Sequence, residues 1–387
     1  MRNSPAYSGC SASGVPLTFV IPMPSPKKIK PLRAATLADV GRAAGVSAMA
    51  ASTVLNGART SSRISEETRE RIVKAAAKLH YRPNAAARAL ANRRMNTIGV
   101  VNVIGPTGVS YYFMEVFNGI LEAAARHDQN TTVLTLHDWS NDTVRLHGFC
   151  DGRIDGLILM APILSPEKTL LPTHTPFVSI HANSPLTNVV NVESDEERGA
   201  WEMVRHMVAL GHRRIMHISG PARWLGPERR IQGYRRALVS SRITFDPQLL
   251  VPGLYTTESG RDGMRAWLKK HAGEPLPHAV FCANDDMAMG CMEALSEVGL
   301  RVPEDISVAG FDDTLAARTT VPQLATVRQP LPKMGSEAVD LLLARIARQN
   351  GSNVTISDKT VVFPTTLIPR TSVGPRPTLE RLVPAAR

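Results

Sequence analysis

Residues 36–57, TLADVGRAAGVSAMAASTVLNG, decide the fold of the N-terminal part of the chain. Thr36 and Ser47 are residue types that cap helix N-termini, and each stands directly before a helix-forming run. Gly45 and Val46 separate the two runs, and glycine permits the sharp turn that brings two short helices together at a steep angle. This pattern predicts a helix-turn-helix, whose second helix fits the DNA major groove. By itself, the same pattern also fits an ordinary αα-hairpin.

The apolar residues of this stretch repeat at helical spacing. We therefore expect six of them to pack the two helices together: Leu37, Val40, Ala44, Val46, Val54 and Leu55. A third helix is predicted from Ser65 to about His80, because Ser65 is a capping residue and acids follow it in the first turn. Pro83 interrupts this helix, and Asn84 starts a short alanine-rich segment. A helix so short is marginal alone, so a conditional hinge is expected there.

The net charge of +11 is concentrated at this end of the chain. Residues 27–94 carry 15 Lys+Arg against 4 Asp+Glu, a balance of +11, and Arg2 adds one. Residues 95–387 then hold 29 basic and 30 acidic side chains, a balance of −1. A compact basic segment on a near-neutral body favours binding to the phosphate backbone of nucleic acid.

The remaining composition predicts a cytoplasmic protein. No stretch approaches the ~20 apolar residues of a membrane span, and we expect no signal peptide. Residues 1–33 are rich in proline and serine and are expected to be disordered. No spacing typical of a zinc site relates the four cysteines, which we expect to be reduced and mostly buried: Cys10, Cys150, Cys282 and Cys291.

From Thr97 onward, apolar strand-like runs alternate with amphipathic helices. The expected strands are TIGVVNV, TTVLTL, GLILM, FVSI, RIMHIS, HAVFC and DISVAGF, and the expected helices span 113–127, 195–210, 228–241, 258–271 and 284–299. Strands separated by helices imply parallel sheets covered on both faces. The segment is longer than one such sheet usually holds, so we expect two doubly wound subdomains with a cleft between them.

The chain lacks the sequence signatures of common enzymes. There is no GxGxxG after the first strand, and no GxSxG, HExxH or P-loop. Asp285-Asp286 and Asp312-Asp313 are carboxylate pairs that suit a metal or acid–base site, or that cap helices and line a polar cleft. We expect the second role, and neither catalysis nor a cofactor nor a bound metal.

Over residues 35–372 the chain resembles the LacI/GalR family of bacterial transcriptional regulators. The motifs that carry the resemblance stand in family order: GVS, VLNG, SEETRERI, YRPNAAARALA, NTIGVV, RIDGLIL, LGHRRI, RIQGYRRAL, ANDDMAMG, VPEDISVAGFDDT and TVRQP. The implied fold is α/β. It has a lambda-repressor-like three-helix DNA-binding domain, a hinge helix, and a periplasmic-binding-protein-like core of two doubly wound parallel-sheet subdomains.

The resemblance and the composition together imply the domain limits. They are an extension (1–33), a DNA-binding domain (34–83), a hinge (84–95), a core (96–372) and a flexible tail (373–387). Within the core, the chain is expected to cross between subdomains near residues 193, 328 and 352. The N-subdomain then holds about 96–193 and 329–352, and the C-subdomain about 194–328 and 353–372.

The resemblance also implies which residues contact double-stranded operator DNA: Thr36, Ser47, Ala48, Met49, Ser52, Thr53, Asn56, Tyr81, Asn84, Ala87 and Leu90. Thr53 stands where the family's usual TVSRVLN has an arginine able to grip guanine, so the operator sequence cannot be inferred. Leu90 matches the leucine that wedges into the minor groove and bends the duplex.

Six residues match the family's effector contacts. Arg230, Asn284 and Asp312 are the polar contacts, and Tyr112 and Tyr255 are the rings. His181 stands where many members carry aspartate, and either it changes the hydrogen bonding there or it lies at the surface. Such a set suits a polyhydroxylated ligand, so a carbohydrate effector is favoured over a nucleoside.

The implied function is a ligand-controlled repressor that binds a pseudo-palindromic operator as a homodimer. The tail after Arg370 has no leucine heptads, which argues against a tetramer. One alternative is a regulator of the same fold whose core binds a partner protein or a nucleoside. A more distant alternative is a solute-binding receptor, which requires an export signal and no basic domain.

Overall fold

The computed structural model describes residues 34–56, 64–82, 94–104, 108–139, 142–164, 171–184, 186, 188–353, 355, 359–377 and 381–384. The chain forms two compact units, Met1–Asn84 and Ala85–Arg387. The predicted N-terminal extension lies outside the described residues. So does most of the predicted hinge, including the expected DNA contacts Asn84, Ala87 and Leu90.

The first unit contains the three predicted helices: α1 (Leu37–Ala44), α2 (Ala48–Asn56) and α3 (Glu66–Lys78). Thr36 caps α1 in a reciprocal capping box with Asp39. Gly45 ends α1 in the left-handed conformation, with φ 67° and ψ 35°, which glycine adopts without steric cost. Ser65 caps α3 by accepting from the Thr68 N–H at 3.3 Å. The predicted cap residues and the turn are therefore confirmed.

One small apolar core joins the three helices. Its buried members are Val40, Ala44, Ala51, Ile72, Ala75 and Ala76, with Leu37, Val46, Val54, Leu55 and Tyr81 packed against them. All six predicted packing residues belong to this cluster. Helix α1 passes so close to the turn that a Cβ at Gly41 would lie 2.8 Å from the Val46 carbonyl oxygen. The helices therefore form a compact helix-turn-helix domain rather than a two-helix hairpin.

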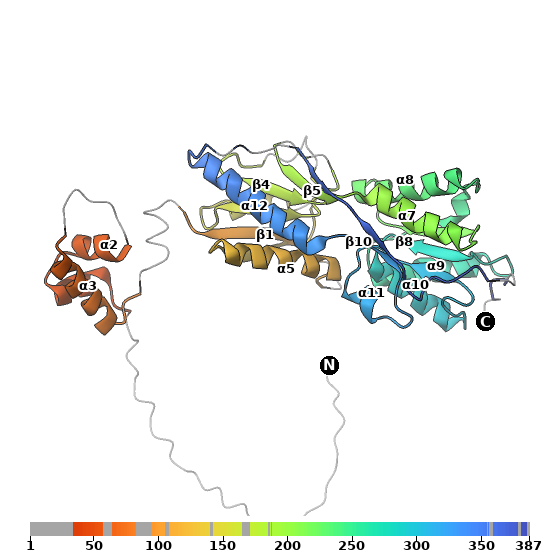
Figure 1. Ribbon diagram of the computed structural model, residues 1–387, viewed down its shortest axis with the longest axis horizontal. Helices are drawn as coiled ribbons and strands as arrows, with labels where there is room; N and C mark the ends of the chain where they lie inside the picture. The colour runs from red at the N-terminus through yellow and green to blue at the C-terminus, as the bar shows by residue number, and fades with distance from the viewer. Residues whose placement is uncertain are drawn as a thin grey trace, which may run out of the picture. The chain divides into compact units, whose positions relative to one another are not determined.

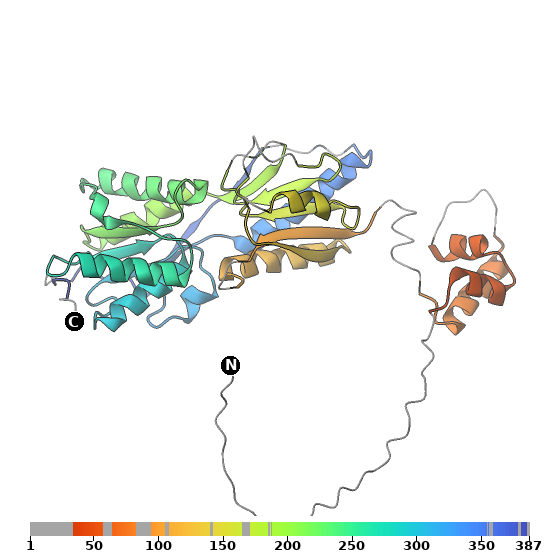
Figure 2. The same ribbon diagram turned by 180° about the vertical axis from the view of Figure 1, so that it is seen from behind.

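The second unit holds two parallel sheets, each with helices on both faces (Figures 1 and 2). The first sheet has the order β11-β5-β4-β3-β1-β2. Its strands are β1 (Thr97–Val103), β2 (Asn130–Leu136), β3 (Gly156–Met160), β4 (Phe177–Ile180), β5 (Val190–Ser194) and β11 (Val361–Phe363). Its helices are α5 (Tyr111–Arg126), α6 (Val144–Phe149) and α12 (Leu331–Gln349), with α5 and α12 packed on one face and α6 on the other. We call this sheet and its helices the N-lobe.

The second sheet has the order β7-β6-β8-β9. Its strands are β6 (Ile215–Ser219), β7 (Leu250–Pro252), β8 (Ala279–Cys282) and β9 (Ser307–Ala309). Helices α7 (Glu196–Ala209) and α8 (Leu225–Ser240) cover one face, and α9 (Thr257–Lys270) and α10 (Asp285–Glu297) cover the other. A short 3₁₀ helix (Pro247–Leu249), α11 (Leu315–Thr319) and the antiparallel pair β10 (Thr326–Arg328) and β12 (Thr366–Ile368) complete the C-lobe.

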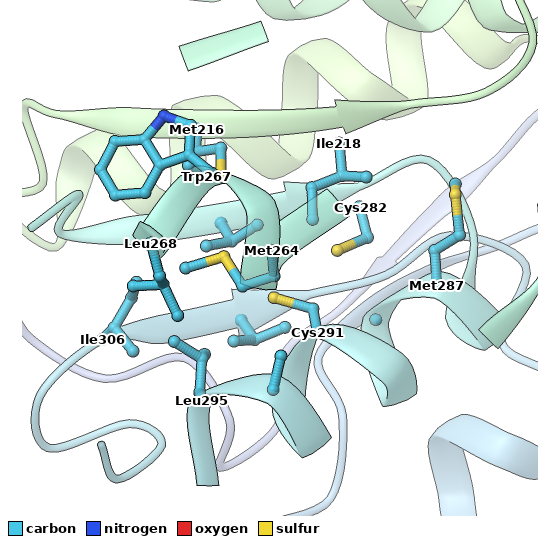
Figure 3. Close-up of a cluster of buried hydrophobic side chains, with 14 of the residues drawn as sticks. Met216, Ile218, Met264, Trp267, Leu268, Cys282, Met287, Cys291, Leu295 and Ile306 are labelled. Carbon is cyan, nitrogen blue, oxygen red and sulfur yellow. The ribbon is translucent and has the colours of Figure 1, made fainter. Parts of the chain in front are cut away.

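Figure 3 shows the C-lobe core, in which side chains of α9 and α10 pack against β6 and β8. Cys282 and Cys291 are fully buried there, and Cys150 is buried in the N-lobe. Their predicted burial is confirmed. Among the described residues, no helix is both long and apolar enough to cross a membrane.

The chain crosses between the lobes three times, and the third crossing was predicted at the wrong place. It passes from β5 to α7, from β10 to α12, and from β11 to β12. Strand β11 pairs in parallel with β5 of the N-lobe, with Phe363 opposite Ser194, whereas β12 pairs with β10 of the C-lobe. The crossing therefore lies at residues 364–365 rather than near 352. Two three-residue strands are too short to give a periodic signal.

The predicted flexible tail is also wrong for the part of it that the structure describes. The Gly273 N–H donates to the Val383 carbonyl at 3.0 Å, and the Val383 N–H donates back to Glu274 at 2.8 Å. Val383 is buried in the C-lobe core, and Arg381 pairs with Asp305 at 3.0 Å. Backbone pairing and one buried valine thus hold residues 381–384 against the C-lobe.

All seven predicted strands and five predicted helices are present, with ends shifted by a few residues. The prediction missed the long helix α12, the short helices α6 and α11, the 3₁₀ helix, and the strands β5, β7, β10, β11 and β12.

His217 of β6 is a neutral histidine in the C-lobe core. Its ring is fully buried and stacks on Phe281, with ring centres 4.8 Å apart, and its Nδ1–H donates to the Phe281 carbonyl at 2.8 Å. Nε2 has no hydrogen-bond partner in the part of the chain that the structure describes. Burial lowers the pKa of His217 from 6.5 to about 4, because a charged ring would need solvation or an acceptor that the core does not offer.

We predict that this histidine makes the protein less stable in mild acid. The pKa is lower in the folded than in the unfolded chain, so the unfolded chain takes up the proton first as the pH falls below 6.5. The contribution of neutral His217 to the free energy of unfolding is therefore fully present above pH 6.5 and is lost as the pH falls toward 4. Between pH 7 and pH 5 this loss is about 2 kcal/mol. Urea unfolding at pH 7 and pH 5 should show a smaller pH dependence in His217→Gln than in wild type. Equal pH dependence would contradict the assignment.

Candidate DNA-contact face and ligand cavity

Helix α2 turns a small apolar and hydroxyl-bearing face to solvent. Ser47, Ala48 and Met49 are exposed, and Met49 is 74% exposed although it is a large apolar residue. The Ser47 Oγ accepts from the Ala50 N–H at 3.1 Å, so Ser47 caps the helix as predicted. A large exposed methionine at the start of a helix-turn-helix second helix suits apolar contact with a thymine methyl.

Thr53 donates its hydroxyl proton to the Met49 carbonyl at 3.0 Å. Its oxygen is then left only as a hydrogen-bond acceptor, and its methyl group is the apolar part of the side chain. Ser52 is half-buried beside it, and Asn56 is the last residue of α2. This face therefore offers fewer directed hydrogen bonds than an arginine would.

Two further predicted contacts lie at the ends of α1 and α3. Thr36 caps α1, and Tyr81 follows α3 and packs against the core of the unit. Thr36 and Tyr81 therefore have structural roles in this unit, whereas Ser47, Ala48 and Met49 at the start of α2 face solvent.

The second unit contains a cavity of about 390 Å³ between its two sheets. All six predicted effector residues line it: Tyr112, His181, Arg230, Tyr255, Asn284 and Asp312. Tyr112 lies in the first turn of α5 and His181 directly follows β4, both in the N-lobe. The other four belong to the C-lobe. The cavity thus lies at the carboxyl ends of the parallel strands, where open α/β sheets generally bind ligands.

Arg230 is the central charge of the cavity wall. It is only 5% exposed, and its Nη2 donates to the Glu196 carboxylate at 2.7 Å and lies 4.0 Å from Asp312. Its Nη1 donates to the Ala283 carbonyl, and the guanidinium lies 4.1 Å from the centre of the Phe311 ring. Burial raises the pKa of Glu196, but the attraction of Arg230 outweighs it and holds that pKa below its usual value.

His181 is part of the cavity wall, so the alternative that it lies at the surface is wrong. Its Nδ1 lies 2.6 Å from the Tyr112 hydroxyl, and its Nε2 accepts from the Ser194 N–H at 3.2 Å. Burial lowers the pKa of His181 to about 4. The ring is therefore neutral near pH 7.

A hydrogen bond joins the Asn284 side chain to the Tyr255 backbone. The Asn284 amide oxygen caps α10 by accepting from the Met287 N–H at 2.9 Å, and its Nδ2 donates to the Tyr255 carbonyl at 3.0 Å. Only one amide N–H of Asn284 remains for a ligand. Tyr255 has a φ of 64° and turns its ring toward Trp224, with ring centres 6.2 Å apart.

The sequence prediction missed several residues of the cavity wall. They include Asn102, His137, Asp138, Trp139, Asn183, Glu196, Trp224 and Arg229. Many of them follow the carboxyl end of a strand, which is the signal that could have identified them.

The carboxylate pairs have largely internal partners. Asp285 accepts from the Thr326 hydroxyl at 2.6 Å and from the Thr314 N–H at 2.8 Å, and Asp313 pairs with Arg328 and Arg370 at 2.7 and 2.6 Å. Within the described ranges there is no group of three or more His, Cys, Asp or Glu arranged to hold a metal ion. Asp285 and Asp313 thus stabilise the wall of the cavity.

Two family models match the chain: bacterial regulatory proteins, lacI family, over residues 36–84, and periplasmic binding protein-like domain, over residues 204–373. The HTH-type transcriptional repressor PurR of Haemophilus influenzae is 31% identical over 320 residues, which are 82% of this chain and 92% of that protein. The ribose operon repressor of the same species is 30% identical over 88% of this chain and 98% of its own.

Solved structures of two transcriptional regulators are similar to most of this chain. The lac repressor dimer bound to operator and the anti-inducer ONPF is 28% identical, with a TM-score of 0.73, over 88% of this chain and 100% of that one. The complex of the transcriptional regulator CelR with cellobiose is 29% identical, with a TM-score of 0.63, over 87% of this chain and 99% of that one.

Proposed function

The chain belongs to the lacI family of bacterial regulatory proteins, and we propose that it is a homodimeric repressor controlled by a neutral carbohydrate in the cavity between its lobes. That it is a ligand-controlled, DNA-binding transcriptional repressor follows from the family. The homodimer, the class of the ligand and the residues that contact DNA and ligand are our proposals. We also propose that it has no enzymatic activity, and that it acts in the cytoplasm, where bacterial operators lie.

The observation that carries the carbohydrate proposal is the balanced charge of a ring-lined cavity. Arg229 and Arg230 face three carboxylates in the wall, Asp138, Glu196 and Asp312. A phosphorylated or otherwise strongly anionic ligand would find no excess of positive charge here, whereas a neutral polyol can donate to the carboxylates and accept from the arginines. Rings suit the apolar faces of a sugar, and they are Tyr112, Phe113, Trp139, Trp224 and Tyr255.

Two relatives support the same class of ligand. The solved structure of CelR holds cellobiose, and the ribose operon repressor of Haemophilus influenzae controls genes for a sugar. A cavity of this size favours a small molecule over a partner protein. Of the two alternatives, a nucleoside fits a cavity of this size better than a partner protein does.

Control of DNA binding would arise because residues of both lobes line the cavity. A ligand that contacts Tyr112 of the N-lobe and Arg230 of the C-lobe binds best at one lobe spacing, and so shifts the population of that state. A coupling of about 1 to 3 kcal/mol changes operator affinity by roughly 5- to 150-fold.

Two measurements on the full chain test this proposal. Selection from random DNA should return a site with inverted-repeat symmetry, because each protomer reads one half-site. A selected site without symmetry would contradict the homodimer. Calorimetry against cellobiose, lactose, ribose, adenosine and glucose 6-phosphate should show binding of a neutral sugar only. Binding of adenosine alone would favour the nucleoside alternative, and a silent panel would favour a partner protein.

A further inference from the structure

A chain of hydrogen bonds runs from the N-lobe wall of the cavity to its C-lobe wall through two of the three crossing segments. The Tyr112 hydroxyl contacts His181 Nδ1 at 2.6 Å, and His181 Nε2 accepts from the Ser194 N–H at 3.2 Å. The Ser194 hydroxyl donates to the Gln329 Oε1, and the Gln329 Nε2 donates to Asp312 Oδ1 at 2.5 Å.

The two middle residues of these hydrogen bonds, Ser194 and Gln329, lie where the polypeptide crosses between the lobes. Ser194 ends β5 just before the first crossing, and Gln329 lies between β10 and α12 at the second crossing. Both are almost fully buried. At the third crossing, the Asp195 N–H donates to Phe363 at 2.9 Å, and the Thr365 hydroxyl donates to the Asp195 carbonyl at 3.3 Å. His181 is therefore connected by hydrogen bonds to the segments that join the two lobes.

The backbone determines the direction of these hydrogen bonds. The Ser194 Oγ also lies 3.3 Å from His181 Nε2, but its own proton goes to Gln329. The Ser194 N–H, in contrast, can only donate, and the lone pair that it requires is on Nε2 of His181. The neutral ring then carries its proton on Nδ1 and donates it to the Tyr112 oxygen. That oxygen is already an acceptor, so the Tyr112 proton is free to point into the cavity. Tyr112 thus presents a donor to the ligand, and the ligand atom opposite must be an acceptor.

We propose that His181 is a positioning residue: it orients the Tyr112 hydroxyl as a donor to the ligand and links that contact through Ser194 and Gln329 to the crossing segments. The proposal rests on the proposed ligand cavity. Three charged groups also face the imidazole: Glu196, Arg229 and Arg230. Desolvation in the cavity wall and the two arginines outweigh the attraction of Glu196, so the ring stays neutral.

The tautomer can be measured without any ligand. Full-length protein labelled with ¹⁵N in its histidine rings should show, at pH 7, a neutral His181 with the proton on Nδ1. The spectrum of His181→Gln identifies the signal by its absence. His217 provides an internal reference for the same tautomer, because its Nδ1–H donates to the Phe281 carbonyl. The His181 signal should stay unchanged down to pH 5.5. A proton on Nε2, or a charged ring at pH 7, overturns the proposal.

Two substitutions test the hydrogen bonds of the two ring nitrogens of His181 one at a time. Asparagine places an amide N–H near the position of Nδ1, so His181→Asn keeps the donor to Tyr112 and loses the acceptor for the Ser194 N–H. It also tolerates the φ of 49° at this position. Glutamine reaches the position of Nε2, so His181→Gln keeps the acceptor for Ser194 and loses the donor to Tyr112.

For a sugar of the panel that binds wild type, we expect different effects of the two variants. His181→Gln should weaken sugar binding on the order of tenfold, because the Tyr112 hydroxyl is no longer oriented. His181→Asn should weaken sugar binding less than His181→Gln does, and the sugar should change operator affinity less than in wild type. Equal losses of sugar affinity and of operator response in both variants overturn the proposal. If no sugar binds, the carbohydrate proposal fails, and the ring spectrum still decides whether His181 orients Tyr112.

Discussion

Replacement of Arg230 by methionine is expected to abolish sugar binding and to cost about 3–5 kcal/mol of stability. The methionine would fill much of the space of the side chain without its charge. Glu196 would then keep only its longer contact with Arg229, and Asp312 would lose the Arg230 charge 4.0 Å away. Removing one partner of a buried ion pair is costly because the other charge stays desolvated.

Urea unfolding and calorimetry on the same preparations would measure both effects. Arg229→Met is the matched control, because Arg229 is the preceding residue of α8 and pairs with Glu193 and Glu196, at 2.9 and 3.7 Å, but its side chain is 32% exposed. We expect a loss of no more than about 1 kcal/mol there, as for other partly exposed pairs.

A double variant separates the charge effect from the loss of packing. Adding Glu196→Gln to Arg230→Met removes the nearest uncompensated carboxylate, so part of the stability should return, while sugar binding stays absent. No recovery in the double variant would mean that Arg230 stabilises the wall by its contacts with the Phe311 ring and the Ala283 carbonyl instead.

The second large effect is expected from Ile72→Ala, which should abolish operator binding and leave ligand binding unchanged. Ile72 of α3 is fully buried, and it is the largest buried side chain in a core otherwise made of alanines and one valine. Truncation of a buried isoleucine costs about 2–5 kcal/mol. A domain of this size has roughly 2–7 kcal/mol in total. The first unit should therefore be largely unfolded, while the second unit has its own cores.

Gel-shift titration with the selected operator and calorimetry with the bound sugar would test this separation. Val73→Ala is the matched control, because Val73 is the next residue of α3 and is 50% exposed. It should change stability by no more than about 0.5 kcal/mol and keep operator binding. Operator binding by Ile72→Ala at wild-type affinity would show that the small core is not needed for the DNA-binding fold.

The local features of the chain were predictable from sequence because short-range physics determines them. Thr36, Ser47 and Ser65 cap helices wherever a helix follows, and Gly45 adopts the left-handed conformation that ends α1. The alternation of apolar runs and amphipathic helices from Thr97 predicted two parallel sheets and the cleft. The six predicted effector residues line one cavity, although α12 and the third crossing were not found correctly.

Tertiary structure alone decided which side chains pair and in which direction. Glu196 lies 34 residues from Arg230, and Ser194 lies 135 residues from Gln329, yet each pair is hydrogen-bonded. Only the fold shows that His181 lines the cavity, that its Nε2 accepts from a backbone N–H, and that residues 381–384 pair with the C-lobe. Sequence patterns report the periodicity of single elements, whereas hydrogen-bond direction and burial depend on which distant elements meet. The chain's membership in a family of DNA-binding regulators was therefore readable from its residues, while the way its cavity presents hydrogen bonds to a ligand was decided by the fold.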